Sequence, residues 1–457
     1  MGVGAVLEPL TVITLLFGGT WINRRREYSN KSSRLGARAQ YFLSSDSISD
    51  SDADEETGLR YALDKYAYAE PRPPSPSLLQ HHKEPWRTRT IAIGPYKFEV
   101  NSPNTATFRH RILSRLLYRL PFLVECWYWA LVYWTYQLGR AFTAVTLRDD
   151  TVDVARHHAL QLVRIEQALG IFVETDIQKF FLNRPMLMNL TNWVYSFIHI
   201  PGTIAFLVWL FYYTTTRNSL DDPRYSPLDH RLNGSPAGPP LYAARRRTLA
   251  VCNLCAFIVF TLWPCMPPRL LSDENVAGSV GDMARSYGFV DTVHGEKGAG
   301  SVWTENRFCN QYAAMPSLHF GYSLMIGLTI MTIPLPPQHT QSKSVRLPLL
   351  PNRISLRFAL PSWRRVVCVI MGAAYPLTIL AAIIATANHF ILDAVAGAFV
   401  CILGWWANSI LLNLLPIEDY FLWVLRMHKP ERQIVDIYED SEQQYESKIV
   451  AHATLMS

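Results

Sequence analysis

Two short sequences contain residue types that can transfer a phosphoryl group. Met315-Pro316-Ser317-Leu318-His319 is followed about 70 residues later by Asn388-His389-Phe390-Ile391-Leu392-Asp393. Each lies at the edge of a long apolar segment, where titratable side chains are costly and usually functional. Two histidines at membrane boundaries, one of them followed by an aspartate, therefore indicate a catalytic site.

His389 and Asp393 are four positions apart, so on a helix their side chains would face each other. A carboxylate that accepts a hydrogen bond from one imidazole nitrogen fixes the tautomer and leaves the other nitrogen free to attack phosphorus. We therefore interpret His389 as the nucleophile of an in-line transfer through a phosphohistidine, and Asp393 as the group that orients it.

His319 is interpreted as the general acid that protonates the leaving alkoxide and then as the base that activates the acceptor. Pro316 suits the first position of a helix, which would place Ser317 and His319 in its first turn. Free N–H groups there favour a phosphate. The guanidinium of Arg269 can hold phosphate oxygens, so Arg269 and Ser317 are the expected phosphate-binding residues.

This chemistry requires no metal and no other cofactor. Two histidines and an aspartate could ligate zinc, but no closely spaced histidine or cysteine set accompanies them. Cys252 and Cys255 lie inside an apolar segment and are expected to pack on one helix face. Cys265 and Cys309 would lie on one side of the membrane, which leaves a disulfide between them open.

The 457-residue chain has polar ends and an apolar middle, so its mean hydropathy of +0.05 averages two populations. Hydrophobic residues make up 49% and aromatic residues 12%, which is typical of a polytopic membrane protein. We predict an N-terminal cytosolic region (1–118), a membrane catalytic domain (119–415) and a cytosolic C-terminal tail (416–457).

The predicted fold is an all-α membrane bundle of six core transmembrane helices. Six apolar segments are long enough to cross about 30 Å of hydrocarbon. They are residues 120–138, 193–213, 249–267, 315–334, 366–387 and 391–415.

Basic residues predict the orientation of this bundle. They exceed acidic residues before the first segment and after the second and fourth, but not after the first and third. Both ends of the bundle should therefore be cytosolic, and Arg269, His319 and His389 should share the opposite face. The net charge of +6 is explained by this topology, and no nucleic-acid surface is indicated.

The polar N-terminal region contains one apolar segment, residues 3–22, which ends before Arg24-Arg25-Arg26. It is either a signal anchor, and thus a seventh span, or a loosely attached terminal helix. Residues 27–80 include an acidic, serine-rich stretch (44–56) and are expected to be a disordered linker. The stretch is either a phosphorylated, regulatory segment or a solvated linker.

Pro316-Ser317-Leu318-His319 and His389-x-x-x-Asp393 resemble the second and third motifs of the type-2 phosphatidic acid phosphatase superfamily, and Arg269 resembles the arginine of its first motif. The flanking residues 310–315 and 394–397, and the stretch 166–174, resemble the inositol phosphorylceramide synthase branch. That branch implies a six-span enzyme of the Golgi or endoplasmic reticulum. Its active site faces the lumen and moves a phosphate-linked headgroup between lipids.

The chain departs from the superfamily pattern at two cations. Leu262 and Leu270 stand where the first motif has lysine and proline, and Ala382-Ile383 stand where the third motif has Ser-Arg. Arg285, Lys297 or Arg307 would have to compensate from the lumenal loop, and Arg307 is the preferred phosphate-binding candidate.

Three functions are consistent with these residues: a lipid phosphotransferase, a lipid phosphate phosphatase that uses water as acceptor, and a non-catalytic membrane scaffold or transporter. The intact Ser317, His319, His389 and Asp393 argue against the third. Two further ionisable residues lie inside apolar segments. His199 is either functional or hydrogen-bonded at the Pro201 kink, and Glu125 is expected to make a structural hydrogen bond.

Overall fold

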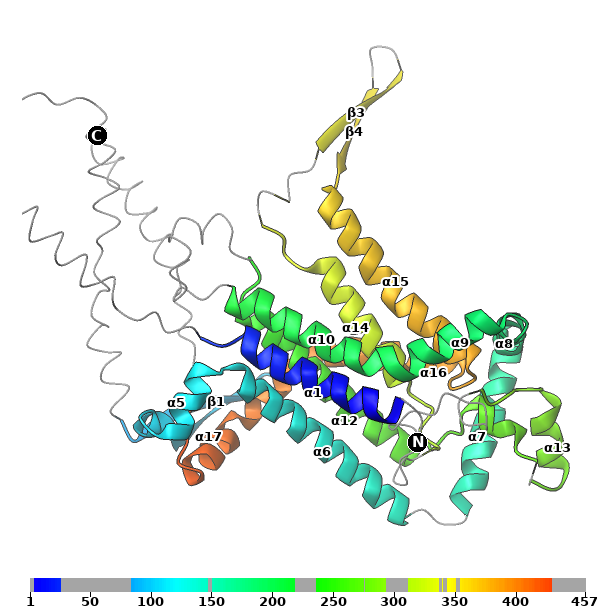
Figure 1. Cartoon of the computed structure of the whole chain (residues 1–457), viewed down its shortest axis with the longest axis horizontal. Helices are drawn as coiled ribbons and strands as arrows, with labels where there is room; N and C mark the ends of the chain where they lie inside the picture. The colour runs from blue at the N-terminus through cyan, green and yellow to red at the C-terminus, as the bar shows by residue number, and fades with distance from the viewer. Residues whose placement is uncertain are drawn as a thin grey trace, which may run out of the picture.

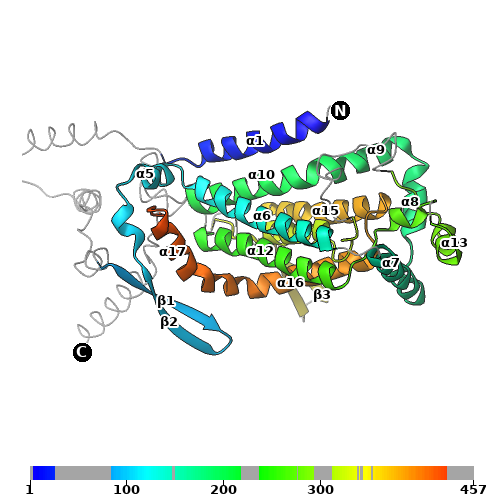
Figure 2. The same ribbon diagram turned by 90° about the horizontal axis from the view of Figure 1, so that it is seen from below.

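The computed structural model describes residues 4–25, 84–146, 150–217, 236–274, 276–292, 311–336, 339, 343–350 and 354–429, and within these the chain is mostly helical. Long helices lie side by side in one bundle, with shorter elements at its two ends (Figures 1 and 2). The long helices are α6 (Phe122–Thr146), α10 (His199–Phe211), α12 (Pro239–Leu262), α14 (Leu318–Thr332), α15 (Trp363–Ala385) and α16 (Ile391–Ala407).

Shorter elements extend or flank these helices. At one end lie α7 (Asp150–Ala168), α8 (Glu174–Leu182) and α13 (Ser279–Ser286), and at the other η1 (Thr105–Phe108), α5 (Ile112–Arg119) and α17 (Leu415–Val424). α9 (Pro185–Trp193), η2 (Val194–Ile198) and η3 (Tyr212–Thr216) continue α10, η4 (Pro268–Ser272) follows α12, and η6 (Asn408–Leu414) joins α16 to α17.

Among the described residues, three helical runs are long and apolar enough to cross a membrane: Pro185–Thr216, Trp363–Ala385 and Ile391–Val424. Pro9–Ile22 and Leu318–Thr332 are apolar but shorter. The remaining predicted spans coincide with α6 and α12, so each predicted apolar segment is largely helical. A membrane protein is therefore supported, while the core of six spans stays a prediction.

Two helix boundaries differ from those predicted. α12 begins at Pro239, ten residues before the predicted span, because prolines are tolerated in the first turn, and it ends at Leu262, just before Pro264. α14 begins at Leu318 and not at Pro316. Ser317 is its N-cap, and the serine hydroxyl accepts a hydrogen bond from the N–H of Phe320, a role in which serine is strongly preferred.

The N-terminal helix α1 (Gly4–Ile22) lies along α10 (Figure 2). A Cβ atom at Gly19 would come within 3.1 Å of side-chain atoms of Val208 and Phe122, so this position is tightly packed. The buried Asn23 then accepts a hydrogen bond from Thr216. This packing favours a firmly held helix over a loosely attached one.

The predominantly helical fold is confirmed, but two antiparallel hairpins that the all-α prediction did not include accompany the helices. β1 (Trp86–Ile93) and β2 (Tyr96–Pro103) are joined by Gly94-Pro95, where Gly94 has a φ of +60° that suits a tight hairpin turn. This hairpin packs against α17, and the Arg89 side chain pairs with Asp419 at 2.8 Å. β3 (Lys343–Leu350) and β4 (Ile354–Leu360) form the second hairpin, which projects from the bundle (Figure 1).

Glycines permit a close helix contact between α14 and α15. A Cβ atom at Gly327 would lie 2.2 Å from the carbonyl oxygen of Gly372, and one at Gly372 would lie 2.6 Å from the carbonyl oxygen of Gly327. Backbone atoms cannot rotate away as a side chain can. Any larger residue at either position must therefore separate the two helices.

We predict that Gly327→Ala lowers the free energy of unfolding by about 1–3 kcal/mol, as overpacking of a close contact does. Thermal melting of the purified protein in detergent measures this. Gly18→Ala is the matched control, because no atom lies within 4 Å of a Cβ atom there. Equal melting temperatures for the two variants would contradict the tight contact.

Candidate active site

The backbone joins the two histidine motifs directly. The N–H of Ser317 donates to the carbonyl oxygen of Asp393 at 2.9 Å, and both residues are fully buried. The contact is so close that a Cβ atom at Gly397 would lie 2.2 Å from the carbonyl oxygen of Ser317. The start of α14 is therefore held against the first turns of α16, although the two motifs are far apart in the sequence.

The imidazole of His389 is oriented mainly by a backbone carbonyl. Its Nδ1 lies 2.8 Å from the carbonyl oxygen of Ala314 and 3.5 Å from Oδ2 of Asp393. Since a carbonyl can only accept, the proton is on Nδ1, and Nε2 has a free lone pair. The tautomer is the one expected for a nucleophile, but the shorter contact is to Ala314, which sequence reasoning did not identify.

Asp393 has a second task at the start of α16. His389 precedes this helix, whose N-cap is Phe390, so the two catalytic candidates do not share a helical turn as predicted. Oδ2 of Asp393 accepts the N–H of Phe390 at 2.9 Å, which is half of a capping box. The carboxylate thus fixes the loop that contains His389 as well as lying beside its ring.

His319 is the second residue of α14, and its side chain lies among aromatic rings. Its ring centroid is 5.5 Å from that of His389, 4.8 Å from that of His199 and 4.9 Å from that of Tyr195. His199 is buried, and its Nδ1 lies 3.4 Å from the hydroxyl of Tyr375. The structure therefore brings His199 into the site, and the signal was an ionisable residue in the middle of an apolar segment.

Arg269 reaches the same site from η4. Its backbone N–H donates to the carbonyl oxygen of Ala387 at 2.9 Å, and its Nε donates to the side-chain oxygen of Asn388 at 3.0 Å. Nη1 also pairs with Asp291 at 3.2 Å. Ala387 has a φ of +52°, a strained conformation for a residue with a Cβ atom, and such strain is concentrated at functional sites.

Two buried glutamates hold the first turn of α16. Oε1 of Glu174 accepts the N–H of Ile391 at 3.0 Å, and Oε1 of Glu166 accepts the N–H of Leu392 at 2.8 Å. Both glutamates are fully buried. These N–H groups have no partner within the helix, so the acceptors must come from elsewhere. The sequence contained these residues within the stretch 166–174 but did not indicate this task.

Burial, with the neighbouring Glu174 as hydrogen-bond partner, raises the pKa of Glu166 from 4.5 to about 9. Glu166 is therefore protonated at neutral pH and acts as a neutral acceptor through Oε1. It lies on α7, outside the apolar runs.

A long cavity of about 710 Å³ begins at the histidines. Arg269, His319, Asn388 and His389 line one end, and most of the remaining wall is apolar. The wall is formed by α1, α6, α10, α12 and α14, with Val12, Trp129, Leu207 and Phe260 among its side chains. Such a cavity suits a ligand with a small polar group and a long apolar part.

The predicted compensating cations are not found beside the histidines among the described residues. Arg307 and Lys297 lie outside those residues. The guanidinium of Arg285 instead binds the carbonyl oxygens of Asp273 and Val276 and the side chain of Asp282. Leu262, which stands where the first motif has lysine, is 77% exposed at the end of α12, so it offers no substitute for that cation.

The two cysteine predictions have different outcomes. Cys252 and Cys255 are free thiols on α12, and Cys265 is a buried free thiol. Cys309 lies outside the described residues.

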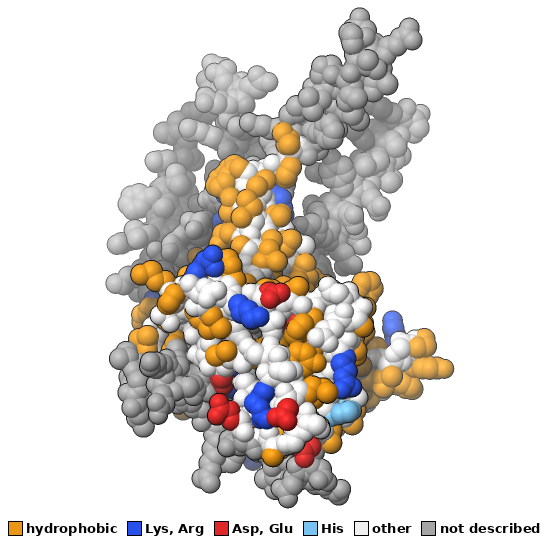
Figure 3. Space-filling view, turned by 90° about the vertical axis from the view of Figure 1, so that its right-hand side faces the viewer, with side chains coloured by type: hydrophobic (Ala, Val, Ile, Leu, Met, Phe, Trp, Pro, Cys, Tyr) orange, Lys and Arg blue, Asp and Glu red, His pale blue; other side chains and the backbone are white. Residues whose placement is uncertain are grey.

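On the visible end face of the bundle, which includes α7, α8 and α13, hydrophobic side chains are mixed with charges of both signs (Figure 3). This face shows no patch of a single charge.

The comparison with protein families gives one match. A family model described as the PAP2 superfamily matches residues 160–220, 237–338 and 355–407. No curated protein and no solved structure matches the chain. The matched residues include Arg269, both histidine motifs and the two glutamates.

We predict that Glu166→Gln retains near-native stability, because the amide oxygen can still accept the N–H of Leu392. Glu166→Leu should lower the free energy of unfolding by about 1–3 kcal/mol, the cost of an unsatisfied buried group. Thermal melting and activity of the same preparations test both.

The raised pKa also predicts a dependence on pH. Between pH 4.5 and about 9, the folded protein holds a proton that the unfolded chain has lost, so wild-type stability should fall as pH rises. Glu166→Gln should remove this part of the slope. Identical slopes in the two proteins would contradict a protonated Glu166.

Proposed function

This chain is a phosphatase or phosphotransferase of the type-2 phosphatidic acid phosphatase superfamily, and from that premise we propose that it moves a phosphate-linked headgroup from one lipid to the hydroxyl of another. The observation that carries the proposal is the pair of histidines, with ring centroids 5.5 Å apart, at the polar end of a long apolar cavity. A small reacting group and a long apolar remainder are the two parts of a phospholipid.

The reaction begins with His389. Its free Nε2 attacks the phosphorus atom of the donor, the phosphorus–oxygen bond to the lipid breaks, and His319 protonates the departing alkoxide. The acceptor hydroxyl then gives its proton to His319 and attacks the phosphohistidine, which restores His389. Arg269 stabilises charge on the equatorial oxygens, with Ser317 beside it at the start of α14.

The described charge beside the histidines matches a phosphodiester substrate. A phosphodiester has one negative charge, whereas a phosphomonoester has close to two at neutral pH. Among the described residues that line the cavity, Arg269 is the one cation grouped with the histidines, and Asp291 offsets part of its charge. Arg269 therefore suits the single negative charge of a phosphodiester lipid as the donor.

Burial of the reacting groups supports a lipid acceptor over water. His389 is 6% exposed and Arg269 is 8% exposed, and most of the cavity wall beyond this polar end is apolar. A site that excludes water protects a phosphohistidine from hydrolysis. Resemblance of the flanking residues to inositol phosphorylceramide synthases further supports a phosphoinositol donor and a ceramide-like acceptor, with the active site on the lumenal side of an endomembrane.

A lipid phosphate phosphatase is the second candidate. The histidines and Asp393 would perform the same first step, and water would replace the acceptor lipid. The superfamily match is equally consistent with this function. The two candidates therefore differ in their products and not in the catalytic residues.

We expect His389→Ala to reduce turnover by at least about 10³-fold, since it removes the nucleophile, and His319→Ala by about 10²–10⁴-fold, since it removes the acid and base. Headgroup transfer in membranes from producing cells measures this. His157→Ala is the matched control, because His157 is exposed and contacts Gln161. Activity that survives His389→Ala would refute the mechanism.

We also expect the products to depend on the acceptor. Membranes are supplied with labelled phosphatidylinositol, ceramide and phosphatidic acid. A labelled phosphosphingolipid that forms only when ceramide is present, and only with an intact His389, would support the transferase. Release of phosphate or diacylglycerol without any acceptor would instead identify a phosphatase.

A further inference from the structure

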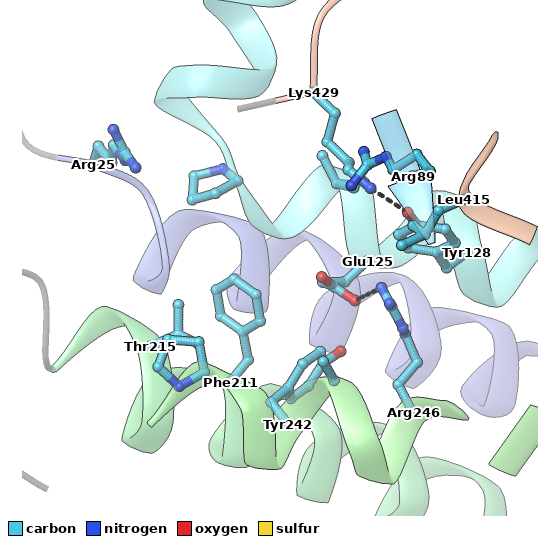
Figure 4. A pocket seen from close by; sticks show the side chains of 14 residues that line it. Arg25, Arg89, Glu125, Tyr128, Phe211, Thr215, Tyr242, Arg246, Leu415 and Lys429 are labelled. Atoms are coloured by element: carbon cyan, nitrogen blue, oxygen red, sulfur yellow. Dashed lines mark hydrogen bonds and ion pairs between the residues drawn. The ribbon is translucent and has the colours of Figure 1, made fainter. Parts of the chain in front are cut away.

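We propose that a second cavity, at the end of the bundle opposite the histidines, binds the phosphorylated headgroup of an anionic membrane lipid (Figure 4). It has a volume of about 380 Å³. Four basic side chains from separate segments reach it: Arg25 after α1, Arg89 on β1, Arg246 on α12 and Lys429 after α17.

The charges around this cavity favour an anion. Glu125 is the one carboxylate in its lining, and it pairs with Arg246 at 2.6 Å. Arg89 and Lys429 pair with Asp419 and Glu418, which do not line the cavity. Three of the four cations are therefore paired with carboxylates, and Arg25 gives the cavity a net excess of one positive charge, which a phosphate can bind.

Arg25 is the cation best placed to hold a ligand. Its guanidinium lies 4.1 Å from the ring centroid of Tyr118, and its backbone N–H donates to the carbonyl oxygen of Arg119. No carboxylate pairs with Arg25 in the part of the chain that the structure describes. Its charge is thus available to an anion that enters the cavity.

A buried hydroxyl in the wall also requires a partner. Tyr242 is 2% exposed, and its hydroxyl donates to no acceptor among the described residues, since its hydrogen-bonding neighbour Trp129 has an indole N–H that can only donate. Figure 4 shows Tyr242 beside Arg246 and below Glu125. A buried hydroxyl without an acceptor is costly, and a phosphate oxygen in the cavity would satisfy it.

The surroundings favour a lipid over a soluble phosphate compound. Pro121, Val124, Phe211 and Leu415 contribute apolar surface to the same cavity. On the neighbouring helix α5, the side chain of Ile112 is 76% exposed and that of Leu113 is 53% exposed. The same helix also contains two arginines. A helix that exposes apolar and basic residues together suits a membrane surface, and basic pockets between membrane helices bind anionic headgroups.

The second cavity lacks the residues that would carry the proposed reaction. Among the described residues that line it there is no histidine, cysteine or serine, so it has no counterpart of the paired histidines. Arg246 lines both cavities, which places the proposed headgroup site at the far end of the substrate cavity. The proposed ligand is therefore a bound effector and not a second substrate, and this inference does not depend on which lipid reacts.

The test measures binding to full-length protein carrying His389→Ala, so that no turnover occurs. Dioctanoyl phosphatidylinositol 4-phosphate, its soluble inositol bisphosphate headgroup and inorganic phosphate are titrated by microscale thermophoresis in neutral detergent. Arg25→Gln and Tyr242→Phe alter the cavity. Arg24→Gln is the matched control, because Arg24 stacks on Trp21, donates to the Trp21 carbonyl oxygen and does not line the cavity.

We expect Arg25→Gln to weaken lipid binding about tenfold and Tyr242→Phe to weaken it severalfold, while Arg24→Gln leaves it unchanged. The lipid should bind at least about tenfold more tightly than its headgroup. Equal affinities would overturn the lipid assignment in favour of a soluble phosphate compound. Lipid binding by Tyr242→Phe that equals lipid binding by Arg24→Gln would overturn the site itself, because Tyr242→Phe removes only one hydroxyl from the cavity wall.

Discussion

The first turn of α16 is the constraint on which the rest of the site depends. Its backbone N–H groups are buried, so each must find an acceptor, and the acceptors come from Glu166, Glu174 and Asp393. In the same turn, the carbonyl oxygen of Asp393 accepts a hydrogen bond from the backbone N–H of Ser317. Satisfying one helix end therefore connects α7, α8, α14 and α16, and His389 lies immediately before this junction.

The candidate catalytic residues could be identified from the sequence because they are ionisable residues at the edges of apolar segments. His319, His389 and Arg269 do lie around one cavity end, as their shared face predicted. The partner of Nδ1 could not be predicted, since any backbone carbonyl can accept and only the folded chain selects Ala314. The glutamates were missed for the same reason, because their targets are backbone groups more than 200 residues away.

Secondary structure was predictable where length and hydropathy decide it, and less so elsewhere. The apolar segments became helices, but the ends of α12 and α14 were set by proline and by a serine cap. The hairpin of β1 and β2 was missed although Gly94-Pro95 is a turn signal and Tyr96–Val100 alternates apolar and polar residues. Its stability depends on packing against α17 through Arg89 and Asp419, a contact across 330 positions.

The N-terminal helix has a consequence for substrate choice. Val12 and Leu16 of α1 form part of the wall of the substrate cavity, although the family match begins only at residue 160. The proposed substrate cavity is thus completed by a segment outside the family match. The proposed function then makes acyl-chain selectivity a property that can change through the first 22 residues alone, without any alteration of the candidate catalytic residues.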